Sequence, residues 1–259
     1  MLLENKVVLV SGIGPGLGRA TALAAARHGA DVVLAARTES RLTQVATEVE
    51  AVGRRALPVV TDISLQEDCT ALVARTMEEF GRIDVLVNNA FKMPPFEPLT
   101  EQAVATIQDT FEVNVFAPMR LSQAVVPHMS AAGGGSIVMI NSVILRQQKP
   151  AYGAYKMAKH SLLGLARSLA VEVGPMNIRV NSVAPGFIGA AVVDLVAQIE
   201  ATERGVSPEK AKEQILESLM LRRAPEPGEI AEAVVFFASD MSRSITGQCL
   251  DVNSGQFTH

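Results

Sequence analysis

Cysteine and histidine are scarce in this sequence, and neither forms a pattern that would bind a metal. The two cysteines, Cys69 and Cys249, lie far apart and make neither a CxxC pair nor a zinc-ligand spacing. The four histidines do not cluster with each other or with the cysteines. We therefore expect no metal site, and the sparse cysteines fit a reduced, cytoplasmic compartment.

Long runs of basic or of apolar residues are also missing. The formal net charge is −4, so the sequence offers no positive field for nucleic acid. The N-terminal residues MLLENKVVLV carry charge before their first apolar run and lack the layout of a signal peptide. Apolar stretches such as VVLAA are too short to span a bilayer. We expect a soluble cytoplasmic protein that binds neither nucleic acid nor membranes.

Short apolar runs alternate with longer amphipathic segments along the 259 residues, of which 48% are hydrophobic. Several runs are apolar at consecutive positions, which is typical of strands buried on both faces of a parallel sheet. The predicted strands are 6–12, 31–37, 55–62, 82–89, 135–142, 177–186 and 247–252, and the predicted helices are 16–28, 39–52, 65–80, 101–129, 153–173 and 228–238. This alternation predicts an α/β fold, a doubly wound parallel sheet of the Rossmann type with helices on both faces.

No linker rich in proline, glycine or serine divides the chain, so residues 1–259 are predicted to form one domain. Residues 187–224 are helical in pattern and too long for a simple crossover between two strands. Excursions after the carboxyl end of a strand usually cover a binding crevice in such sheets. We interpret residues 187–224 as a substrate-covering excursion, with a plain surface insertion as the alternative.

The stretch SGIGPGLGR (11–19) follows the first predicted strand and opens the first helix. Its glycines, Gly12, Gly14, Gly16 and Gly18, let the backbone turn tightly and approach a ligand closely. The helix start then directs unpaired N–H groups and a positive dipole end at a pyrophosphate. In this strand–turn–helix context the motif predicts a dinucleotide-binding loop.

The second predicted strand ends in Ala36 and Arg37, where an NAD site usually has an acidic residue for the ribose 2′-hydroxyl. A guanidinium at this position suits a 2′-phosphate through charge-assisted hydrogen bonds. The sequence therefore favours NADP(H), with NAD(H) as the second choice. The alternative is that Arg37 is a solvated residue at the end of a strand.

The only two tyrosines stand in AYGAYKMAKH (151–160), each with a lysine four residues later. Tyr155 and Lys159 are one helical turn apart and share a face, as do Tyr152 and Lys156. Tyr152 and Lys159 are seven residues apart and also lie on nearly one face. Three pairings are thus available for proton transfer.

Together with this loop, NNA (88–90), Ser142, Tyr155, Lys159 and PG (185–186) make the chain resemble the short-chain dehydrogenase/reductase family along essentially its whole length. The resemblance implies a single Rossmann-type domain, hydride transfer with a nicotinamide cofactor, and a homotetramer or homodimer. It also favours Tyr155 over Tyr152, because Ser142 and Tyr155 have the separation typical of the family.

Chemical roles follow for four residues. Tyr155 is the expected general acid/base, and the ammonium of Lys159, aided by an oxidised nicotinamide, is expected to lower the pKa of its phenol towards the working range. Ser142 is expected to hydrogen-bond the substrate oxygen. Asn114 is the fourth member that the resemblance suggests. Pro118, four residues later, lacks the N–H that would bond the Asn114 carbonyl, so that carbonyl is expected to hold a water that relays protons to Lys159.

The resemblance also assigns the cofactor contacts, and two departures from the family pattern fall among them. Phe91 replaces the glycine that usually follows NNA, and Ala190 supplies no hydroxyl for the cofactor, although the Ile188 backbone remains. The expected cofactor-binding residues are Gly12, Gly14, Pro15, Gly16, Leu17, Gly18, Arg37, Asp62, Ile63, Asn89, Ala90, Tyr155, Lys159, Pro185, Gly186 and Ile188.

The expected substrate wall consists of Phe91, Ile144, Tyr152 and Phe187, joined by Met93, Phe96, Val192, Val193 and Leu195. These mostly apolar side chains favour a greasy alcohol or ketone over a sugar. We expect an NADP(H)-dependent oxidoreductase that interconverts a secondary alcohol and a carbonyl, for example of the 3-oxoacyl, steroid or terpenoid type. The alternatives are an enoyl-thioester reductase that uses Tyr152 with Lys159, and a dinucleotide-binding sensor without turnover.

Overall fold

The structure of the protein, a computed structural model, describes residues 1–257 and is built around one parallel sheet. Its seven strands are ordered β3-β2-β1-β4-β5-β6-β7, and every pairing between neighbours is parallel. The strands are β1 (Val7–Ser11), β2 (Asp31–Ala36), β3 (Ala56–Val60), β4 (Val85–Asn88), β5 (Gly135–Ile140), β6 (Ile178–Pro185) and β7 (Cys249–Val252). The predicted fold class is confirmed.

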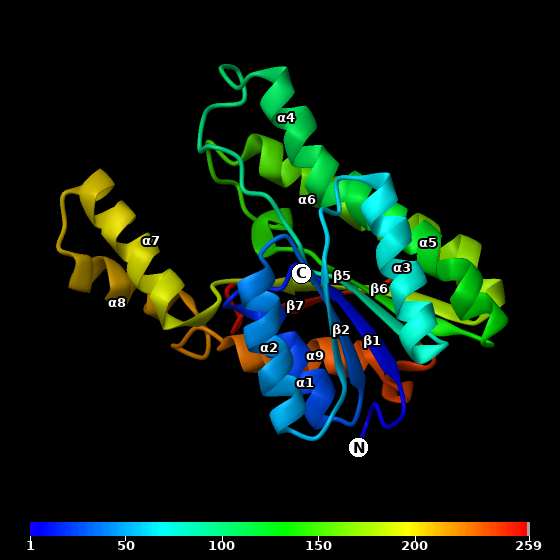
Figure 1. The fold of residues 1–259 in the computed structure, drawn as a ribbon. Helices are drawn as coiled ribbons and strands as arrows, with labels where there is room; N and C mark the ends of the chain where they lie inside the picture. The colour runs from blue at the N-terminus through cyan, green and yellow to red at the C-terminus, as the bar shows by residue number, and fades with distance from the viewer. Residues whose placement is uncertain (258–259) are drawn as a thin grey trace.

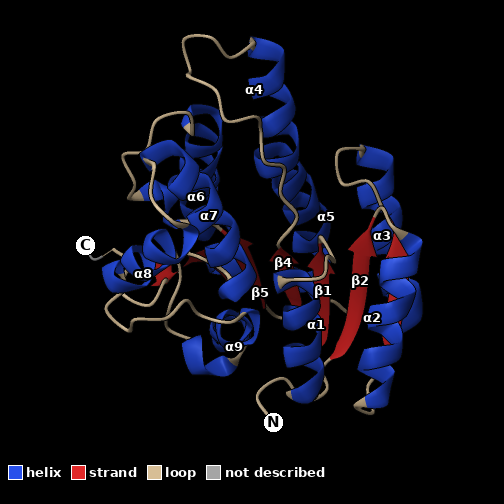
Figure 2. Ribbon diagram, turned by 90° about the vertical axis from the view of Figure 1, so that its left-hand side faces the viewer, coloured by secondary structure: helices blue, strands red, loops and turns tan. Residues whose placement is uncertain are grey.

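Helices cover both faces of this sheet (Figures 1 and 2). On one face lie α1 (Leu17–Arg27), α2 (Glu39–Ala51) and α9 (Pro227–Ala238). On the other face lie α3 (Gln66–Phe80), α5 (Ala117–Ala131) and α6 (Gly153–Val173). The helix α4 (Val104–Phe111) precedes α5, and α7 (Gly189–Arg204) and α8 (Pro208–Ser218) follow β6.

The two faces of β1 show why its run of apolar residues is continuous. Val8 and Val10 belong to the hydrophobic cluster under α1 and α9. Val7 and Leu9 belong to the cluster under α3, α5 and α6. All four are at most 3% exposed, so successive side chains leave the strand towards opposite, equally covered faces.

The strand order reverses direction at the centre of the sheet. The chain moves outward from β1 to β2 and β3 and then returns to place β4 on the other side of β1. Ligands bind in the crevice outside the carboxyl ends of the strands at such a switch point. The glycine-rich loop follows β1 and Asn89 follows β4, so both lie at this crevice.

The helix predicted over 101–129 is present from Val104 to Ala131 but contains one irregular turn. The structure has α4, then a wider π-helical turn over Glu112–Phe116, and then α5. Pro118 stands in the first turn of α5 and has no N–H to donate to the Asn114 carbonyl, which explains why the regular hydrogen-bond ladder is interrupted just before it. Periodicity alone does not reveal the extra residue of such a turn.

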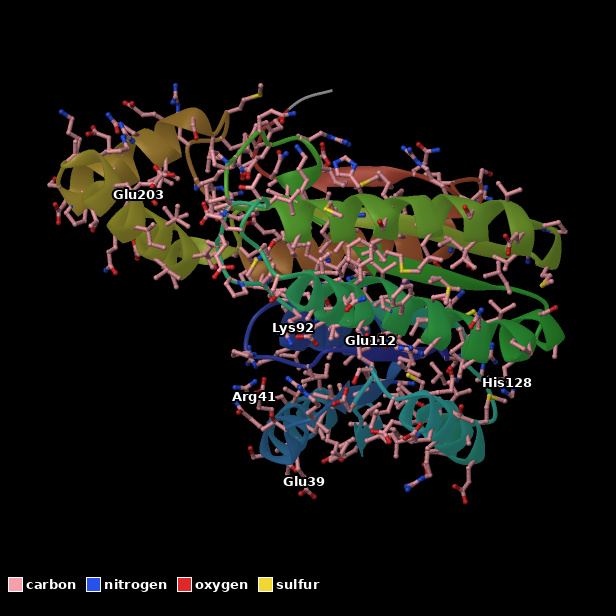
Figure 3. The ribbon with its side chains drawn as sticks, turned by 90° about the horizontal axis from the view of Figure 1, so that it is seen from above. Glu39, Arg41, Lys92, Glu112, His128 and Glu203 are labelled. Atoms are coloured by element: carbon pink, nitrogen blue, oxygen red, sulfur yellow. The ribbon has the colours of Figure 1, made fainter. Side chains whose placement is uncertain are left out.

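The segment predicted as an excursion forms a hairpin of α7 and α8 that projects from the body of the molecule (Figure 1). Gly205 ends α7 in the left-handed conformation, at φ 65°, and the Ser207 side chain caps α8 by accepting a hydrogen bond from the Lys210 N–H. The two helices share a small hydrophobic cluster of Val193, Ala197, Ala201, Ala211 and Ile215. Glu203 marks the outlying position of this hairpin in Figure 3. That the hairpin covers a substrate stays a prediction.

Candidate active site

The candidate reactive groups lie where β5 ends and α6 begins. Ser142 follows β5 by two residues, and its Oγ accepts a hydrogen bond from the Ile144 N–H at 3.2 Å. Tyr155, in the first turn of α6, is buried, and the Ser142 side chain lies close enough to its phenol to lower the phenol's pKa. Lys159, one turn further along α6, is 2% exposed. The fold thus brings these three residues together at one end of a pocket.

Among residues 1–257, the one hydrogen-bond acceptor of the Lys159 ammonium is the Ile140 carbonyl oxygen, at 2.8 Å. Its Nζ lies 5.6 Å from the centre of the Tyr155 ring. Burial disfavours the charged amine and lowers the pKa of Lys159 to about 7. The lysine is therefore close enough to act on the phenol but loses much of its charge near neutral pH.

Lys159 alone, without the oxidised nicotinamide that the prediction also includes, does not lower the pKa of the phenol. Burial raises the pKa of Tyr155 to about 12, and the nearby Ser142 side chain only partly opposes this. The reason is that both groups are removed from water and the ammonium is held by Ile140. A further positive charge beside the phenol is needed before Tyr155 can serve as a base.

Tyr152 lies in a different environment from Tyr155. It is the residue just before α6, its ring packs 4.7 Å from the ring of Phe96, and the Lys149 ammonium lies 5.4 Å from its centre. The Lys156 ammonium turns away to the Gln147 carbonyl oxygen, at 2.6 Å. Tyr152 therefore belongs to the wall of the pocket, and the Tyr152/Lys156 pair is not a proton-transfer arrangement.

Asn114 does not line the pocket, although it is buried close to it. Its amide nitrogen donates to the carbonyl oxygens of Lys92, at 2.8 Å, and Thr110, at 2.9 Å. Its amide oxygen accepts from the Lys92 N–H at 3.3 Å. The side chain thus fixes the segment that follows β4, and the relay through the Asn114 carbonyl stays a prediction.

The glycine-rich loop is held tightly at two of its four glycines. Gly12 has φ 85°, and its carbonyl oxygen accepts a hydrogen bond from the Asn89 amide at 2.7 Å. A Cβ on Gly12 would lie 2.4 Å from the Ala90 Cα, and one on Gly18 would lie 2.3 Å from the Gly12 oxygen. Gly14, in contrast, has no atom within 4 Å of the position of a Cβ and faces the pocket. The space above Gly14 is therefore available to a ligand.

These contacts predict different effects for two alanine substitutions. Gly12→Ala is expected to lower the free energy of unfolding by about 2 kcal/mol or more, because it forces both a backbone clash and an unfavourable φ. Gly14→Ala is expected to leave unfolding nearly unchanged and to weaken dinucleotide binding. Urea unfolding and fluorescence titration of both variants measure the two effects. Equal destabilisation by the two substitutions would contradict this account of the loop.

Two arginines stand at the end of the pocket near β2. Arg37 follows β2 directly and Arg41 lies in the first turn of α2; both side chains are exposed and line the pocket. Neither makes an ion pair with any residue between 1 and 257. The positive charge of Arg37 helps to lower the pKa of Asp62, whose carboxylate mainly accepts hydrogen bonds from Ser64. Figure 3 shows Arg41 and Lys92 on the same side of the molecule.

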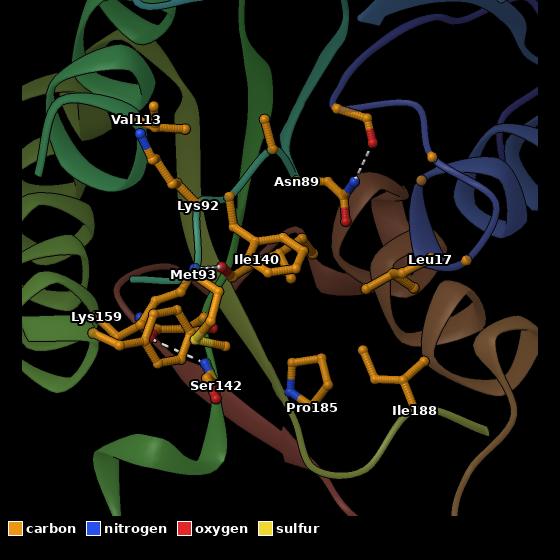
Figure 4. A pocket seen from close by; sticks show the side chains of 18 of the residues that line it. Leu17, Asn89, Lys92, Met93, Val113, Ile140, Ser142, Lys159, Pro185 and Ile188 are labelled. Carbon is orange, nitrogen blue, oxygen red and sulfur yellow. Dashed lines mark hydrogen bonds between the residues drawn. The ribbon is translucent and has the colours of Figure 1, made fainter. Parts of the chain in front are cut away.

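A single cavity of about 980 Å³ connects these parts, a volume at the upper end of those typical for small-molecule sites. Figure 4 shows Leu17 and Asn89 at one end, Ser142 and Lys159 at the other, and Pro185 and Ile188 below the space between them. With the exception of Asn114, every residue expected to bind cofactor or to react lines it. The residues expected on the substrate wall line it too, except Val193, which packs in the α7–α8 cluster.

Sequence reasoning missed several residues that line the cavity. Arg41 could have been found, since it lies in the first turn of the predicted helix 39–52, four residues after Arg37. Gln256 lies in the C-terminal segment, about 70 residues from Gly186 in sequence, and no local pattern points to it. Ala190 is exposed and is not part of the wall, so the alanine leaves no gap in it.

No helix within residues 1–257 is long and apolar enough to cross a membrane. The same residues contain no group of three or more His, Cys, Asp or Glu side chains that could hold a metal ion.

The glycine-rich loop lies at the switch point of the parallel sheet, and the buried residues Ser142, Tyr155 and Lys159 lie at the far end of the same cavity. This combination is typical of dinucleotide-binding oxidoreductases. Comparisons with known proteins agree. A family model described as enoyl-(acyl carrier protein) reductase matches residues 12–256. The chain belongs to the short-chain dehydrogenase/reductase family.

Individual relatives match over nearly the whole chain. Dehydrogenase/reductase SDR family member 4 of Homo sapiens is 35% identical over 98% of this chain and 88% of its own length. The 3-oxoacyl-[acyl-carrier-protein] reductase FabG of Thermotoga maritima is 32% identical over 98% of this chain and 99% of its own. The crystal structure of carveol dehydrogenase from Mycobacterium avium in complex with NAD aligns with a TM-score of 0.90, at 31% identity, covering 98% of both chains.

Proposed function

We propose that this protein is an NADP(H)-dependent oxidoreductase that interconverts a secondary alcohol and the corresponding carbonyl compound. The observation that carries the proposal is the buried arrangement of Ser142, Tyr155 and Lys159 at one end of a cavity whose other end is the glycine-rich loop. A protein that only binds a dinucleotide has no need of this set. That argues against a sensor without turnover.

The cavity fits a nicotinamide dinucleotide. The open space above Gly14 and the start of α1, where Gly16 provides no side-chain cap, leave N–H groups for a pyrophosphate. Asp62, Ile63 and Ala90 line the adenosine end, and the proposed holders of the nicotinamide end are Lys159, Pro185 and Ile188. When bound, this cofactor supplies or accepts the hydride. Carveol dehydrogenase, a structural relative, was solved in complex with NAD, which supports a nicotinamide dinucleotide as the cofactor.

Residues of the chain transfer the proton and bind the substrate oxygen. In reduction, the Ser142 and Tyr155 hydroxyls hydrogen-bond the carbonyl oxygen, and Tyr155 donates its proton to that oxygen as the alkoxide forms. A phenol with a pKa of about 12 holds this proton until negative charge develops on the substrate. Lys159, held by the Ile140 carbonyl, then returns a proton to the tyrosinate. In oxidation the same transfers run in reverse.

The substrate is proposed to be apolar. Phe91, Met93, Phe96, Val192 and Leu195 line the cavity, and between 39% and 59% of each side chain is exposed. An apolar ligand that covers these side chains removes their surface from water, at about 25 cal/mol per Å². Gln147 adds a polar amide to this part of the wall.

The second candidate is reduction of an enoyl thioester with Tyr152 as the acid. The description of the matching family model favours this reaction, whereas the geometry favours Tyr155. Tyr152 packs against Phe96 and Lys149, while Tyr155 lies close to Ser142 and beside Lys159. An assay with an enoyl thioester and a ketone in parallel separates the two reactions.

The preference for NADP(H) rests on the two arginines near β2. Arg37→Ala combined with Arg41→Ala is expected to weaken NADPH binding by roughly tenfold to a hundredfold, because both charged partners of a 2′-phosphate are lost. NADH affinity is expected to stay nearly constant. Fluorescence titration of wild type and variant with both cofactors at one salt concentration measures this, with Arg75→Ala on α3 as the matched control. If wild type binds NADH at least as tightly as NADPH, the proposed preference is refuted.

A further inference from the structure

Gln256 has a buried polar atom that no described residue satisfies. Its Oε1 is shielded from solvent and makes no hydrogen bond with any residue between 1 and 257, and its amide nitrogen likewise has no bonded partner there. The residue lines the cavity described above. That oxygen is packed against Gly186, whereas the amide nitrogen is not shielded and is the atom of this group that a ligand in the cavity can reach. Polar groups at such sites nearly always have a partner, so an unpaired amide N–H in a cavity wall indicates a ligand that supplies an acceptor.

The backbone that carries Gln256 is firmly built. The Asn253 side chain is buried, and its Oδ1 accepts hydrogen bonds from the N–H groups of Gly255, at 2.9 Å, and Gln256, at 3.2 Å. Its amide nitrogen donates to the Phe257 carbonyl oxygen at 3.3 Å. The Ser254 carbonyl oxygen accepts a further bond from the Leu221 N–H at 3.1 Å. The position of Gln256 is thus fixed by four hydrogen bonds around it.

Gln256 lies at the reactive end of the cavity. Its Oε1 is 2.6 Å from the position that a Cβ on Gly186 would occupy, so the glycine leaves the room for this amide. Gly186 follows Pro185, and Figure 4 shows Pro185 between Ser142 and Ile188, on the lower side of the cavity. The groups expected to bind phosphate and adenosine follow β1, β2, β3 and β4, whereas Gly186 follows β6, on the far side of β5 in the sheet.

The chemistry of the amide limits its partner. The accessible amide nitrogen offers two donors, so its partner must present an acceptor oxygen. If the cavity holds a nicotinamide dinucleotide, as proposed above, the nicotinamide ring carries such an oxygen in its own carboxamide. Ala190 provides no competing hydroxyl in the wall.

We infer that Gln256 binds the carboxamide of the nicotinamide ring and so fixes which way the ring faces in the cavity. This assignment rests on the proposed cofactor. It makes Gln256 a cofactor-positioning residue contributed by the segment after β7, far in sequence from the glycine-rich loop and from α6.

The test compares two ligands that differ only in the nicotinamide. Gln256→Met keeps the length and packing of the side chain and removes its hydrogen bonds. Isothermal titration is carried out with NADPH and with 2′-phospho-ADP-ribose, which lacks the nicotinamide ring. The variant is expected to bind NADPH about five- to tenfold more weakly, because it loses one or two neutral hydrogen bonds. It is expected to bind 2′-phospho-ADP-ribose as tightly as wild type does.

Gln248→Met is the matched control, since Gln248 is exposed and lies outside the cavity wall. Equal affinity of Gln256→Met and wild type for NADPH overturns the inference. Equal weakening for both ligands also overturns it, because Gln256 then supports the fold of the site, which thermal unfolding of the free protein would reveal. A raised KM for the carbonyl substrate with unchanged NADPH affinity assigns Gln256 to the substrate instead. Failure of wild type to bind either ligand refutes the proposed function itself.

Discussion

Tyr155→Phe is expected to lower kcat for ketone reduction by roughly 10²–10⁴, the range that a positioned general acid contributes. The substitution removes only the hydroxyl that lies close to Ser142 and leaves the buried ring in place. The variant is therefore expected to fold, which circular dichroism checks, and to fail in the proton-transfer step. Steady-state kinetics with NADPH and an apolar ketone give the magnitude.

Tyr152→Phe is the matched control for this experiment. It also removes one phenolic hydroxyl from the cavity wall, but the ring contact with Phe96 is retained. Activity on the ketone is expected to stay within about tenfold of wild type, as for a residue that only shapes the wall. If Tyr152→Phe is inactive on an enoyl thioester while Tyr155→Phe retains that activity, the enoyl-thioester reaction replaces the one proposed.

Lys159→Met is expected to abolish most activity and, at the same time, to make the free protein more stable at pH 7. The lysine is 2% exposed, and among residues 1–257 its one hydrogen-bond acceptor is the Ile140 carbonyl oxygen, so its charged form is poorly solvated in the folded state. Its pKa falls from 10.5 to about 7 on folding. Each unit of pKa shift corresponds to 1.36 kcal/mol, so burying the lysine lowers the free energy of unfolding of wild type at neutral pH by at most about 5 kcal/mol.

The dependence on pH has a definite sign. Because the folded protein holds the lysine proton less tightly than the unfolded chain does, the free energy of unfolding of wild type rises as the pH increases from 7 towards 10.5. Burial raises the pKa of Cys69 and of Cys249 to about 11, so the unfolded chain releases these protons first and the cysteines partly oppose the rise near pH 9, equally in wild type and variant. Tyr155, whose pKa burial also raises, contributes little in this window. Urea unfolding in this window is expected to give a rising curve for wild type and a flatter one for Lys159→Met. Parallel curves for the two proteins would contradict the burial of a destabilised ammonium.

Periodicity predicted the strands and most helices because their residues are covered on both sides of one sheet. The run Val7–Val10 is an example, since each side chain enters one of two buried clusters. The π turn at Glu112–Phe116 escaped prediction, because it arises from a hydrogen-bond pattern around Pro118 and changes the apolar spacing little. Strand order was equally out of reach, since it depends on contacts distant in sequence.

The candidate site likewise has parts that the sequence predicted and parts that it did not. Tyr155 and Lys159 could be placed together from their spacing on one helix, and the glycine-rich loop from its own motif. The opposing pKa shifts of Tyr155 and Lys159 could not be predicted from the sequence, because they depend on burial in the folded protein and on the Ile140 carbonyl. Gln256 was missed for a related reason: only the folded chain brings it against Gly186.

The α7–α8 hairpin has a small hydrophobic cluster of its own, separate from the two clusters that stabilise the sheet. A substitution within it is expected to change the shape of the cavity beside Val192 and Leu195 without disturbing the spacing of Ser142, Tyr155 and Lys159, which β5 and α6 set. The architecture is in this sense modular. If the hairpin covers the substrate, as predicted, exchanging it changes the compound that is turned over and leaves the chemistry intact.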